Sequence, residues 1–390
     1  MLDTHRLLVE HAVTPEGAVA DALIVTDGDR IVSCQQASNP AADEVERVEG
    51  WAVPGFVDTH VHGGGGFDYA TEDPEEAVAA REFHAANGTT TTFASLLTAP
   101  VDVLCRQLAT LADLVDDGHF AGIHLEGPFL SERQRGAHDP ALLRAPDPDC
   151  VAQLVEAARG RLSMVTLAPE LPGAVEAIAQ LIGADVRVAV GHSGADERTL
   201  DAALESGATV ATHLFNAMPP IHHRRPGPVP RLLTDCRVGI ELIADGFHVH
   251  PDVLKLAVVT AGGQRVSLVT DAMAAAGMSD GDYALGALDV RVRDGRARLV
   301  GPDGSAGSIA GSTLTMAGAF ELMTRIVGDI ATVAVMASTN AARRFDMSEV
   351  GMIAPGYCAD LCVVDGAGAL QRVMRGGRWL NPALTDRSPA

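Results

Sequence analysis

Three consecutive stretches decide the fold: VRVAVGHS (186–193), ERTLDAALESG (197–207) and TVATHLFNAM (209–218). The first and third are short and rich in β-branched residues, which is typical of buried strands. The middle stretch places apolar residues at three- and four-residue spacing and ends at a glycine, which predicts a helix. Strand, helix and strand in this order indicate two parallel strands that are joined by a crossover helix.

The same alternation continues outward in both directions. Six further strand-like runs are FVDTHVH (56–62), TTTTFAS (89–95), AGIHLEG (121–127), LSMVTLAPE (162–170), VGIELIADGFH (238–248) and RVSLVTDAM (265–273). Eight strands that alternate with helices predict a closed parallel (β/α)8 barrel. We expect residues 274–310 to form a hairpin excursion after the eighth strand, and residues 312–345 to complete the barrel with helices.

Both ends of the chain differ from this middle part. Residues 1 to about 50 and residues 346–382 contain short runs in which apolar and polar positions alternate, as in ALIVTDGDRIVSC and RVMRGGRWL. Such runs predict small strands and turns. The two ends could therefore pair into one small β domain beside the barrel.

Composition narrows the classes of function. The formal net charge of −22 argues against general binding to nucleic acid or to anionic membrane surfaces, and favours simple solubility. Charged residues interrupt the first twenty positions, and no apolar stretch approaches the roughly 18 residues that span a bilayer. The six cysteines are scattered without zinc-knuckle or secreted-scaffold spacing, so we expect a reduced, cytoplasmic protein.

Side chains that can bind metal recur at the carboxyl ends of the predicted strands. They are His60, His62, Glu126, His192, His213, His248 and Asp271, from six different strands. In (β/α)8 barrels the active site lies at that end of the barrel. A single buried histidine is more often a satisfied core residue, but coincidence does not explain a whole set at equivalent strand ends.

His60 and His62 are two residues apart, so both imidazoles lie on the same side of a strand and can chelate one ion. Asp58 has the same parity and could orient a ligand or simply pack. Imidazole and carboxylate ligands together suit zinc or a related transition metal ion. Structural zinc sites are usually closed and rich in sulfur, whereas this thiol-poor set indicates an open, catalytic site.

Seven motifs give these residues a specific context. PGFVDTHVHGGGG, HLEGPFL, GHSGA, THLFNAMPP, IADGFHVHP, LVTDAMAAAG and AGSTLTM resemble, in order, the N-acetylglucosamine-6-phosphate deacetylase family of amidohydrolases. The resemblance implies a metal-dependent barrel (53–345) with a small β-sandwich formed by both chain ends (1–52 and 346–390). It also implies a homodimer that hydrolyses N-acetyl-D-glucosamine 6-phosphate to D-glucosamine 6-phosphate and acetate.

The resemblance assigns the metal ligands. Glu126, His192 and His213 would hold the main ion, while His60 and His62 would hold a second ion that Glu126 bridges. Some members of the family lack the histidine pair and use one ion, so we expect one or two divalent transition ions per subunit. Zinc is favoured, with iron, cobalt, manganese or cadmium as alternatives. Other amidohydrolases bridge their ions through a carboxylated lysine, but the only lysine, Lys255, lies in a helix-like run.

The resemblance also assigns the catalytic residues. Asp271 corresponds to the catalytic base: a carboxylate there can take the proton of a metal-activated water and deliver it to the leaving amine. His138 corresponds to the residue that polarises the carbonyl oxygen and stabilises the tetrahedral oxyanion. Taken alone, His138 would be interpreted as an exposed loop histidine.

A basic cluster, His222 to Arg225, follows the sixth strand of this acidic chain. It is as compatible with a solvated loop as with an anion pocket. The resemblance favours Arg224 and His248 as phosphate contacts, with the arginine from the same or the neighbouring subunit. The other substrate contacts that it implies are Ala137, His138, Asn216, Ala217, Ile309, Ala310 and Gly311.

Two other functions remain open from the sequence. One is a deacetylase that acts on a different N-acylated sugar or on an amino acid. The other is a catalytically inactive barrel that serves as a scaffold, which the presence of every expected ligand disfavours.

Overall fold

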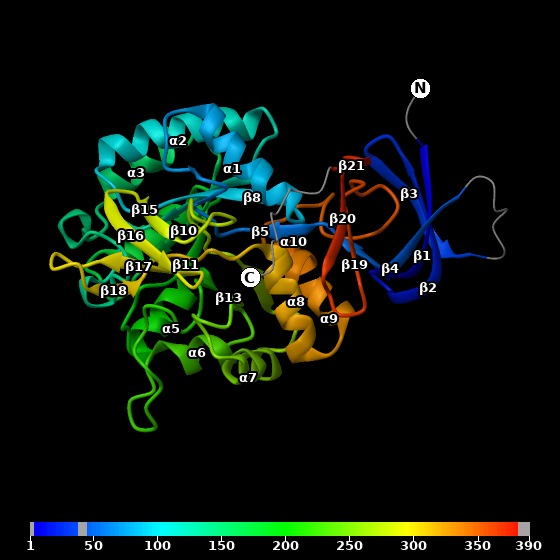
Figure 1. The fold of residues 1–390 in the computed structure, drawn as a ribbon. Helices are drawn as coiled ribbons and strands as arrows, with labels where there is room; N and C mark the ends of the chain where they lie inside the picture. The colour runs from blue at the N-terminus through cyan, green and yellow to red at the C-terminus, as the bar shows by residue number, and fades with distance from the viewer. Residues whose placement is uncertain (1–3, 38–44, 381–390) are drawn as a thin grey trace. The chain divides into compact units, whose positions relative to one another are not determined.

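The structure is a computed structural model and describes residues 4–37 and 45–380 of the 390-residue chain. Its central feature is one sheet of eight strands in the spatial order β14-β13-β12-β11-β10-β9-β8-β5. Several of these strands are labelled in Figure 1. The strands are β5 (Phe56–Asp58), β8 (Thr89–Leu96), β9 (Gly122–Glu126), β10 (Leu162–Leu167), β11 (Arg187–Val190), β12 (Ala208–Ala211), β13 (Gly239–Ile243) and β14 (Val266–Val269). All eight predicted strands are present in the predicted order, which confirms the barrel class.

Backbone hydrogen bonds link the segments that follow the first and the last strand. The Asp271 N–H donates to the His60 carbonyl (2.8 Å), and the His62 N–H donates to the Ala272 carbonyl (2.8 Å). The sheet therefore closes at the end that carries the metal-binding side chains, which is the end where barrel enzymes build their active sites.

Helices alternate with the barrel strands. They are α1 (Pro74–Ala86), α2 (Val101–Asp116), α3 (Pro148–Ala157), α4 (Ala174–Gly183), α5 (Glu197–Glu205), α6 (Pro228–Thr234) and α7 (Pro251–Ala261). α5 illustrates why they form: the Asp196 carboxylate caps its first turn by accepting from the Thr199 N–H. Its apolar face buries Leu200, Ala203 and Leu204, which recur at three- to four-residue spacing.

The predicted excursion after β14 is larger than one hairpin. β15 (Gly281–Leu285), β16 (Leu288–Arg293), β17 (Arg296–Val300) and β18 (Ala306–Ile309) form a separate antiparallel sheet (Figure 1). Its buried face packs around a small core with Val290, Val292 and Ala297. The predicted helix set then follows as α8 (Met316–Val327), α9 (Ile330–Ala334), a π-helical segment (Val335–Thr339) and α10 (Asn340–Arg344).

Strands from both chain ends share one seven-stranded sheet in the order β21-β20-β19-β4-β1-β2-β3. They are β1 (Thr4–Thr14), β2 (Gly17–Asp27), β3 (Arg30–Gln36), β4 (Glu46–Pro54), β19 (Leu361–Val364), β20 (Leu370–Arg375) and β21 (Arg378–Trp379). β19 joins the two ends by pairing antiparallel with β4. Residues such as Leu7, Ile24 and Leu361 form a separate hydrophobic core there, which confirms the small β domain.

The chain divides into two compact units. One comprises Met1–Asp58, Glu82–Thr91 and Thr315–Ala390, and the other comprises Thr59–Arg81 and Thr92–Leu314. The domain boundaries at 52/53 and 345/346 stay a prediction, and its outer limits at 1 and 390 lie outside the described residues. Within the described ranges, every helix is too short or too polar to cross a bilayer.

Candidate metal centre and active site

Every predicted metal ligand lies in the unit that contains residues 59–81 and 92–314. His192, His213 and Asp271 each follow a barrel strand by two residues and have positive φ angles of 48°, 27° and 50°. Such angles are uncommon for residues other than glycine and persist only where the surrounding structure fixes them. The chain therefore turns sharply just beyond three strands, and each turn holds one polar side chain of the site.

Glu126 lies at the centre of the site, at the last position of β9. Its Oε1 atom is 2.9 Å from His192 Nε2 and 3.0 Å from His213 Nε2. Its Oε2 atom is 3.2 Å from His62 Nε2 and 3.5 Å from His60 Nε2. Each carboxylate oxygen thus faces a different histidine pair, which is the arrangement that a bridging ligand requires.

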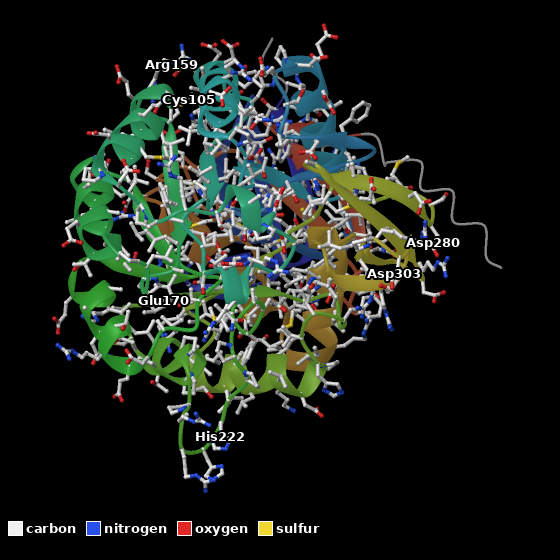
Figure 2. All side chains as sticks on the ribbon, turned by 90° about the vertical axis from the view of Figure 1, so that its left-hand side faces the viewer. Cys105, Arg159, Glu170, His222, Asp280 and Asp303 are labelled. Atoms are coloured by element: carbon white, nitrogen blue, oxygen red, sulfur yellow. The ribbon has the colours of Figure 1, made fainter. Side chains whose placement is uncertain are left out.

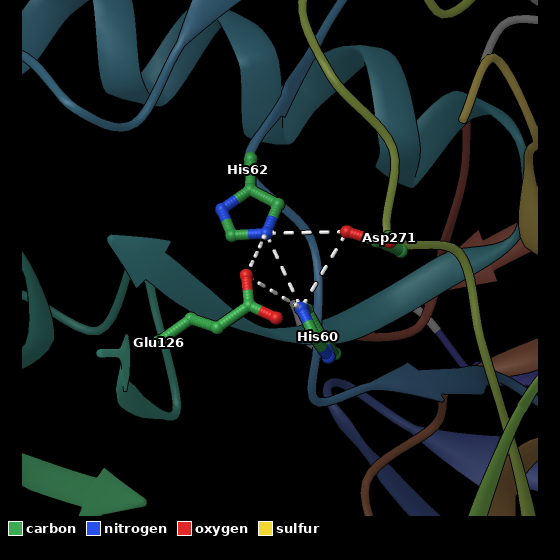
Figure 3. Close-up of side chains that lie close together, drawn as sticks. All are labelled: His60, His62, Glu126 and Asp271. Carbon is green, nitrogen blue, oxygen red and sulfur yellow. Dashed lines mark hydrogen bonds and ion pairs between the residues drawn. The ribbon is translucent and has the colours of Figure 1, made fainter. Parts of the chain in front are cut away.

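Figure 3 shows the side that His60, His62, Glu126 and Asp271 form. Asp271 Oδ1 is 3.2 Å from His62 Nε2 and 3.5 Å from His60 Nε2, and the two Nε2 atoms are 3.2 Å apart. A tetrahedral ion with bonds of about 2.0–2.1 Å separates its ligand atoms by about 3.3 Å. The spacing therefore fits a transition metal ion at this side.

The other side brings His192 Nε2 and His213 Nε2 within 3.1 Å of each other. His192 Nδ1 donates to the Gln134 carbonyl (2.9 Å), and His62 Nδ1 donates to the Ser95 carbonyl (3.2 Å). A proton on Nδ1 leaves Nε2 free to bind an ion, as is usual for histidine ligands. His213 Nδ1 has no hydrogen-bond partner among the described residues.

The carboxylates of the site are ionised although they are buried. Burial alone would raise the pKa of Glu126, but the charge of His60 and hydrogen bonds from the other histidines hold this pKa well below its ordinary value. Burial would likewise raise the pKa of Asp271, and the charge of His60 and a hydrogen bond from His62 lower it. A pair of ionised carboxylates whose charged partners, among the described residues, are histidines is suited to a divalent cation.

His138 lies beside this cluster and is buried, not exposed as its sequence context alone suggests. Its Nε2 atom is 3.5 Å from Glu126 Oε2, and its Nδ1 atom is 2.9 Å from Thr98 Oγ1. Burial lowers the pKa of His138 to about 4, so the ring is neutral near pH 7. This position suits a hydrogen-bond donor to substrate, although the same atoms also form a candidate ligand group with Glu126 and His192.

A cavity of about 300 Å³ opens onto the cluster. Its lining residues are His62, Leu97, Glu126, Gly136, Ala137, His138, His192, His213, Asn216, Ala217, His248, Asp271, Leu285, Ser308, Ile309 and Gly311. Most of the predicted substrate contacts therefore share one cavity. Ala310 does not line it, because its side chain is fully buried in the core of the excursion sheet.

The two predicted phosphate contacts lie in different surroundings. His248 lines the cavity, and its Nδ1 atom is 2.6 Å from Asp245 Oδ2, which fixes the ring. Arg224 is exposed on the loop between β12 and α6 and is not among the cavity-lining residues. Figure 2 shows the neighbouring His222 at the tip of this projecting loop.

Sequence reasoning missed Glu241 and Thr98 and, among the cavity residues that the excursion contributes, Leu285 and Ser308. Glu241 is a carboxylate in the apolar run GIELI of β13, and its Oε2 atom is 3.3 Å from His60 Nδ1. A charged residue inside a short apolar strand was the signal that could have found it. Leu285 and Ser308 had no such signal, because only tertiary packing brings β15 and β18 to the cavity.

Comparison with known proteins agrees with this geometry. The model of the Amidohydrolase family matches residues 51–380. N-acetylgalactosamine-6-phosphate deacetylase of Escherichia coli O157:H7 is 35% identical over 98% of this chain and 100% of its own length. N-acetylglucosamine-6-phosphate deacetylase of Lysinibacillus sphaericus is 33% identical over 88% of this chain and 90% of its own length.

A solved structure is also similar over nearly the whole chain. It is a mutant of N-acetyl-D-glucosamine-6-phosphate deacetylase from Mycobacterium smegmatis in complex with N-acetyl-D-glucosamine-6-phosphate. It superposes with a TM-score of 0.92 at 43% identity and covers 97% of this chain and 99% of that chain. Fold, site geometry and relatives agree, and we conclude that this chain is an enzyme of the amidohydrolase family.

Proposed function

We propose that this enzyme hydrolyses the acetamide of N-acetyl-D-glucosamine 6-phosphate to give D-glucosamine 6-phosphate and acetate. The observation that carries the proposal is Glu126, whose two oxygens each face a histidine pair at a cavity of about 300 Å³. The relatives that match most of the chain are named deacetylases of amino-sugar 6-phosphates, which supports this substrate class.

The metal ligands follow from the donor atoms. Glu126, His192 and His213 would hold one divalent ion, and His60 and His62 would hold a second ion that shares Glu126. When bound, such ions lower the pKa of a coordinated water and polarise the amide carbonyl. Zinc suits these nitrogen and oxygen donors best, and iron, cobalt, manganese and cadmium are the alternatives.

The residues of the chain supply the proton transfers. Asp271, which is ionised and only 9% exposed, takes the proton of the attacking water and then protonates the leaving amine. Without this second transfer the amine would leave as a poor anion. His138 donates a hydrogen bond to the carbonyl oxygen as negative charge develops on that atom.

The cavity binds the sugar phosphate. The proposed substrate contacts that line it are Ala137, Asn216, Ala217, His248, Ile309 and Gly311. The side chain of Ala310 does not reach it, so Ala310 is left with its backbone alone as a contact. Arg224 contacts the phosphate from the neighbouring subunit of a homodimer. Arg224 is exposed and does not line the cavity of its own chain, which supports this arrangement.

The 4-epimer, N-acetyl-D-galactosamine 6-phosphate, is the second candidate substrate. It is favoured by the E. coli relative, which is named for that sugar and matches this chain over its full length. The two sugars share the acetamide and the phosphate and differ only at the C4 hydroxyl. Both would therefore use the same metal and proton-transfer residues.

An acetate-release assay on purified, metal-loaded protein tests both candidates. We expect turnover of an N-acetylhexosamine 6-phosphate, and the ratio of kcat/KM for the two epimers assigns the preferred one. N-acetylated amino acids and unphosphorylated N-acetylglucosamine are the comparison substrates. Equal or faster release from these would contradict the proposal.

A further inference from the structure

Glu241 is the buried carboxylate that the proposed reaction does not use. It lies in the middle of β13, with only apolar residues and glycine beside it in the strand, and it is 2% exposed. Burying an ionised carboxylate is costly unless hydrogen bonds or charges compensate it. Its partners therefore indicate its role.

Both oxygens of this carboxylate have partners in the segment that follows β5. Oε1 accepts a hydrogen bond from Thr59 Oγ1 (3.2 Å), and Oε2 is 3.3 Å from His60 Nδ1. Within the described part of the chain, no lysine or arginine contacts Glu241. Its one charged or chargeable partner is thus a predicted metal ligand.

The contact fixes which nitrogen of His60 is available. A carboxylate oxygen at Nδ1 holds a proton there, so when an ion binds, the Nε2 lone pair is the one that faces it, on the side of His62, Glu126 and Asp271. His62 and His192 instead direct Nδ1 at the backbone carbonyls of Ser95 and Gln134. Because an anionic acceptor makes an imidazole a stronger ligand than a neutral one does, His60 is the most strongly supported ligand of the set.

Charge balance points in the same direction. Glu126, Asp271 and Glu241 are three buried carboxylates whose charged or chargeable partners, in the described structure, are histidines alone. Such an excess of buried acidic groups over basic ones suits the binding of cations, and Glu241 lies on the His60 side, where the second ion would bind.

We propose that Glu241 is a positioning residue that holds His60 in its Nδ1-protonated form and so creates the second metal site. The inference rests on the proposed metal-dependent function. It predicts that Glu241 governs the affinity of the His60–His62 side, while the Glu126–His192–His213 side binds its ion without it.

The test is a Zn²⁺ titration of the metal-free full-length chain against a competing chelator, which gives the number of bound ions and the Kd of each. Glu241→Gln keeps an oxygen that can accept the Nδ1 proton but removes the charge, and Glu241→Leu removes both. Asp235→Asn is the matched control, because it removes a buried carboxylate that pairs with Arg231 and Arg237, outside the site. Circular dichroism of each metal-free variant establishes that it is folded.

We expect the wild type to bind two ions. Glu241→Gln should raise the Kd of the weaker ion about 10-fold and Glu241→Leu about 100-fold, the usual range for an outer-shell partner. The Kd of the tighter ion should stay within about threefold in all variants, and Asp235→Asn should match the wild type. Co²⁺ titrations should show the same loss. In the Glu241 variants, the absorption that the second equivalent of Co²⁺ adds should disappear, while the absorption of the first equivalent remains.

Two results would overturn the inference. One is that both variants, Glu241→Gln and Glu241→Leu, are folded and each binds the second ion as tightly as the wild type does. The other is a parallel weakening of both ions, which would indicate a general effect on folding. The proposed reaction is tested by a different readout. If the wild type binds two ions but releases no acetate, the proposed reaction is wrong, while the titrations still support the role of Glu241.

Discussion

Asp271 combines the properties that a proton-transfer base needs. It is nearly buried, ionised, and held 3.2 Å from His62 Nε2 by a backbone turn with a positive φ angle. Asp271→Asn keeps the shape and removes the base, so we expect kcat to fall by about 100- to 10,000-fold while substrate still binds. Acetate release measures kcat, and calorimetry measures substrate binding.

The metal content of Asp271→Asn must be measured in the same preparation, because Oδ1 also faces the second ion site. A variant that holds its metal and turns over at the wild-type rate would remove Asp271 from the role of base. A variant that binds neither metal nor substrate would instead identify Asp271 as a structural ligand.

Thr98 is the side chain that faces Nδ1 of His138. Its Oγ1 atom is 2.9 Å from His138 Nδ1 and also lies 3.4 Å from the Glu126 carbonyl, to which it can donate. It donates to the ring instead when the ring hydrogen is on Nε2, the atom that faces Glu126 Oε2 (3.5 Å). Nε2 of the neutral ring then keeps its hydrogen and can donate to the substrate. We expect Thr98→Val to lower kcat about tenfold with little change in KM, less than the 100- to 1000-fold cost of losing an oxyanion donor.

Thr98→Ser is the matched control, because it keeps the hydroxyl and should retain near-normal turnover. The nitrogen chemical shifts of His138 report the tautomer directly. If Thr98→Val changes neither those shifts nor kcat, Thr98 has a packing role alone.

The sequence predicted side chains better than it predicted the groups that orient them. His192 and Asp271 could be found because each is a polar residue at the end of an apolar strand. The partners of His192 and His62 are the backbone carbonyls of Gln134 and Ser95, which have no sequence signature. Only folding reveals which carbonyl meets which ring.

At the scale of elements, the barrel strands were predictable because parallel strands are buried on both faces and form continuous apolar runs. The excursion after β14 was underpredicted as a hairpin. A strand such as LDVRVR in β16 alternates clearly, but alternation and turn glycines do not show how many strands pair into one sheet. The exposed loop between β12 and α6 contains no regular strand or helix. Its sequence therefore indicated a basic charge but not where the loop carries that charge.

This loop carries the prediction that belongs to an element. Arg224→Ala should raise KM for the phosphorylated sugar about 10- to 100-fold, the loss expected for a charge-assisted hydrogen bond. Unphosphorylated N-acetylglucosamine should be hydrolysed almost as before. Arg225→Ala, on the same exposed loop, is the matched control and should have little effect. Equal losses on both substrates would remove Arg224 from the phosphate site.

Co-expression of Arg224→Ala with Asp271→Asn tests whether the arginine acts on the neighbouring subunit. In a mixed dimer, one site then has an intact Asp271 and receives an intact Arg224 from the partner. Random pairing should restore activity at low substrate to about a quarter of the wild-type value. An arginine that acts within its own chain gives no such recovery.

At the scale of the whole molecule, the site determines how stability depends on pH when no metal is bound. Burial alone would lower the pKa of His62, but hydrogen bonds and charges from Asp271 and Glu126 outweigh it and raise this pKa to about 9. The value in the unfolded chain is about 6.5. The protonated ring therefore contributes stability that is complete below about pH 6.5 and is lost as the pH rises through about 9, an effect of about 3 kcal/mol.

A bound ion replaces that proton, so metal-loaded protein should behave in the opposite way. Metal ligands must be deprotonated, and the stabilisation by metal therefore grows with pH. We expect the Tm of chelator-treated protein to fall between about pH 6.5 and pH 9, while the Tm of zinc-loaded protein stays level or rises. The gap between them should be widest near pH 9. In metal-free His62→Asn, the fall of the Tm with pH should be smaller than in the wild type. If the difference in Tm between zinc-loaded and metal-free protein narrows as the pH rises, the metal does not bind at the histidine cluster.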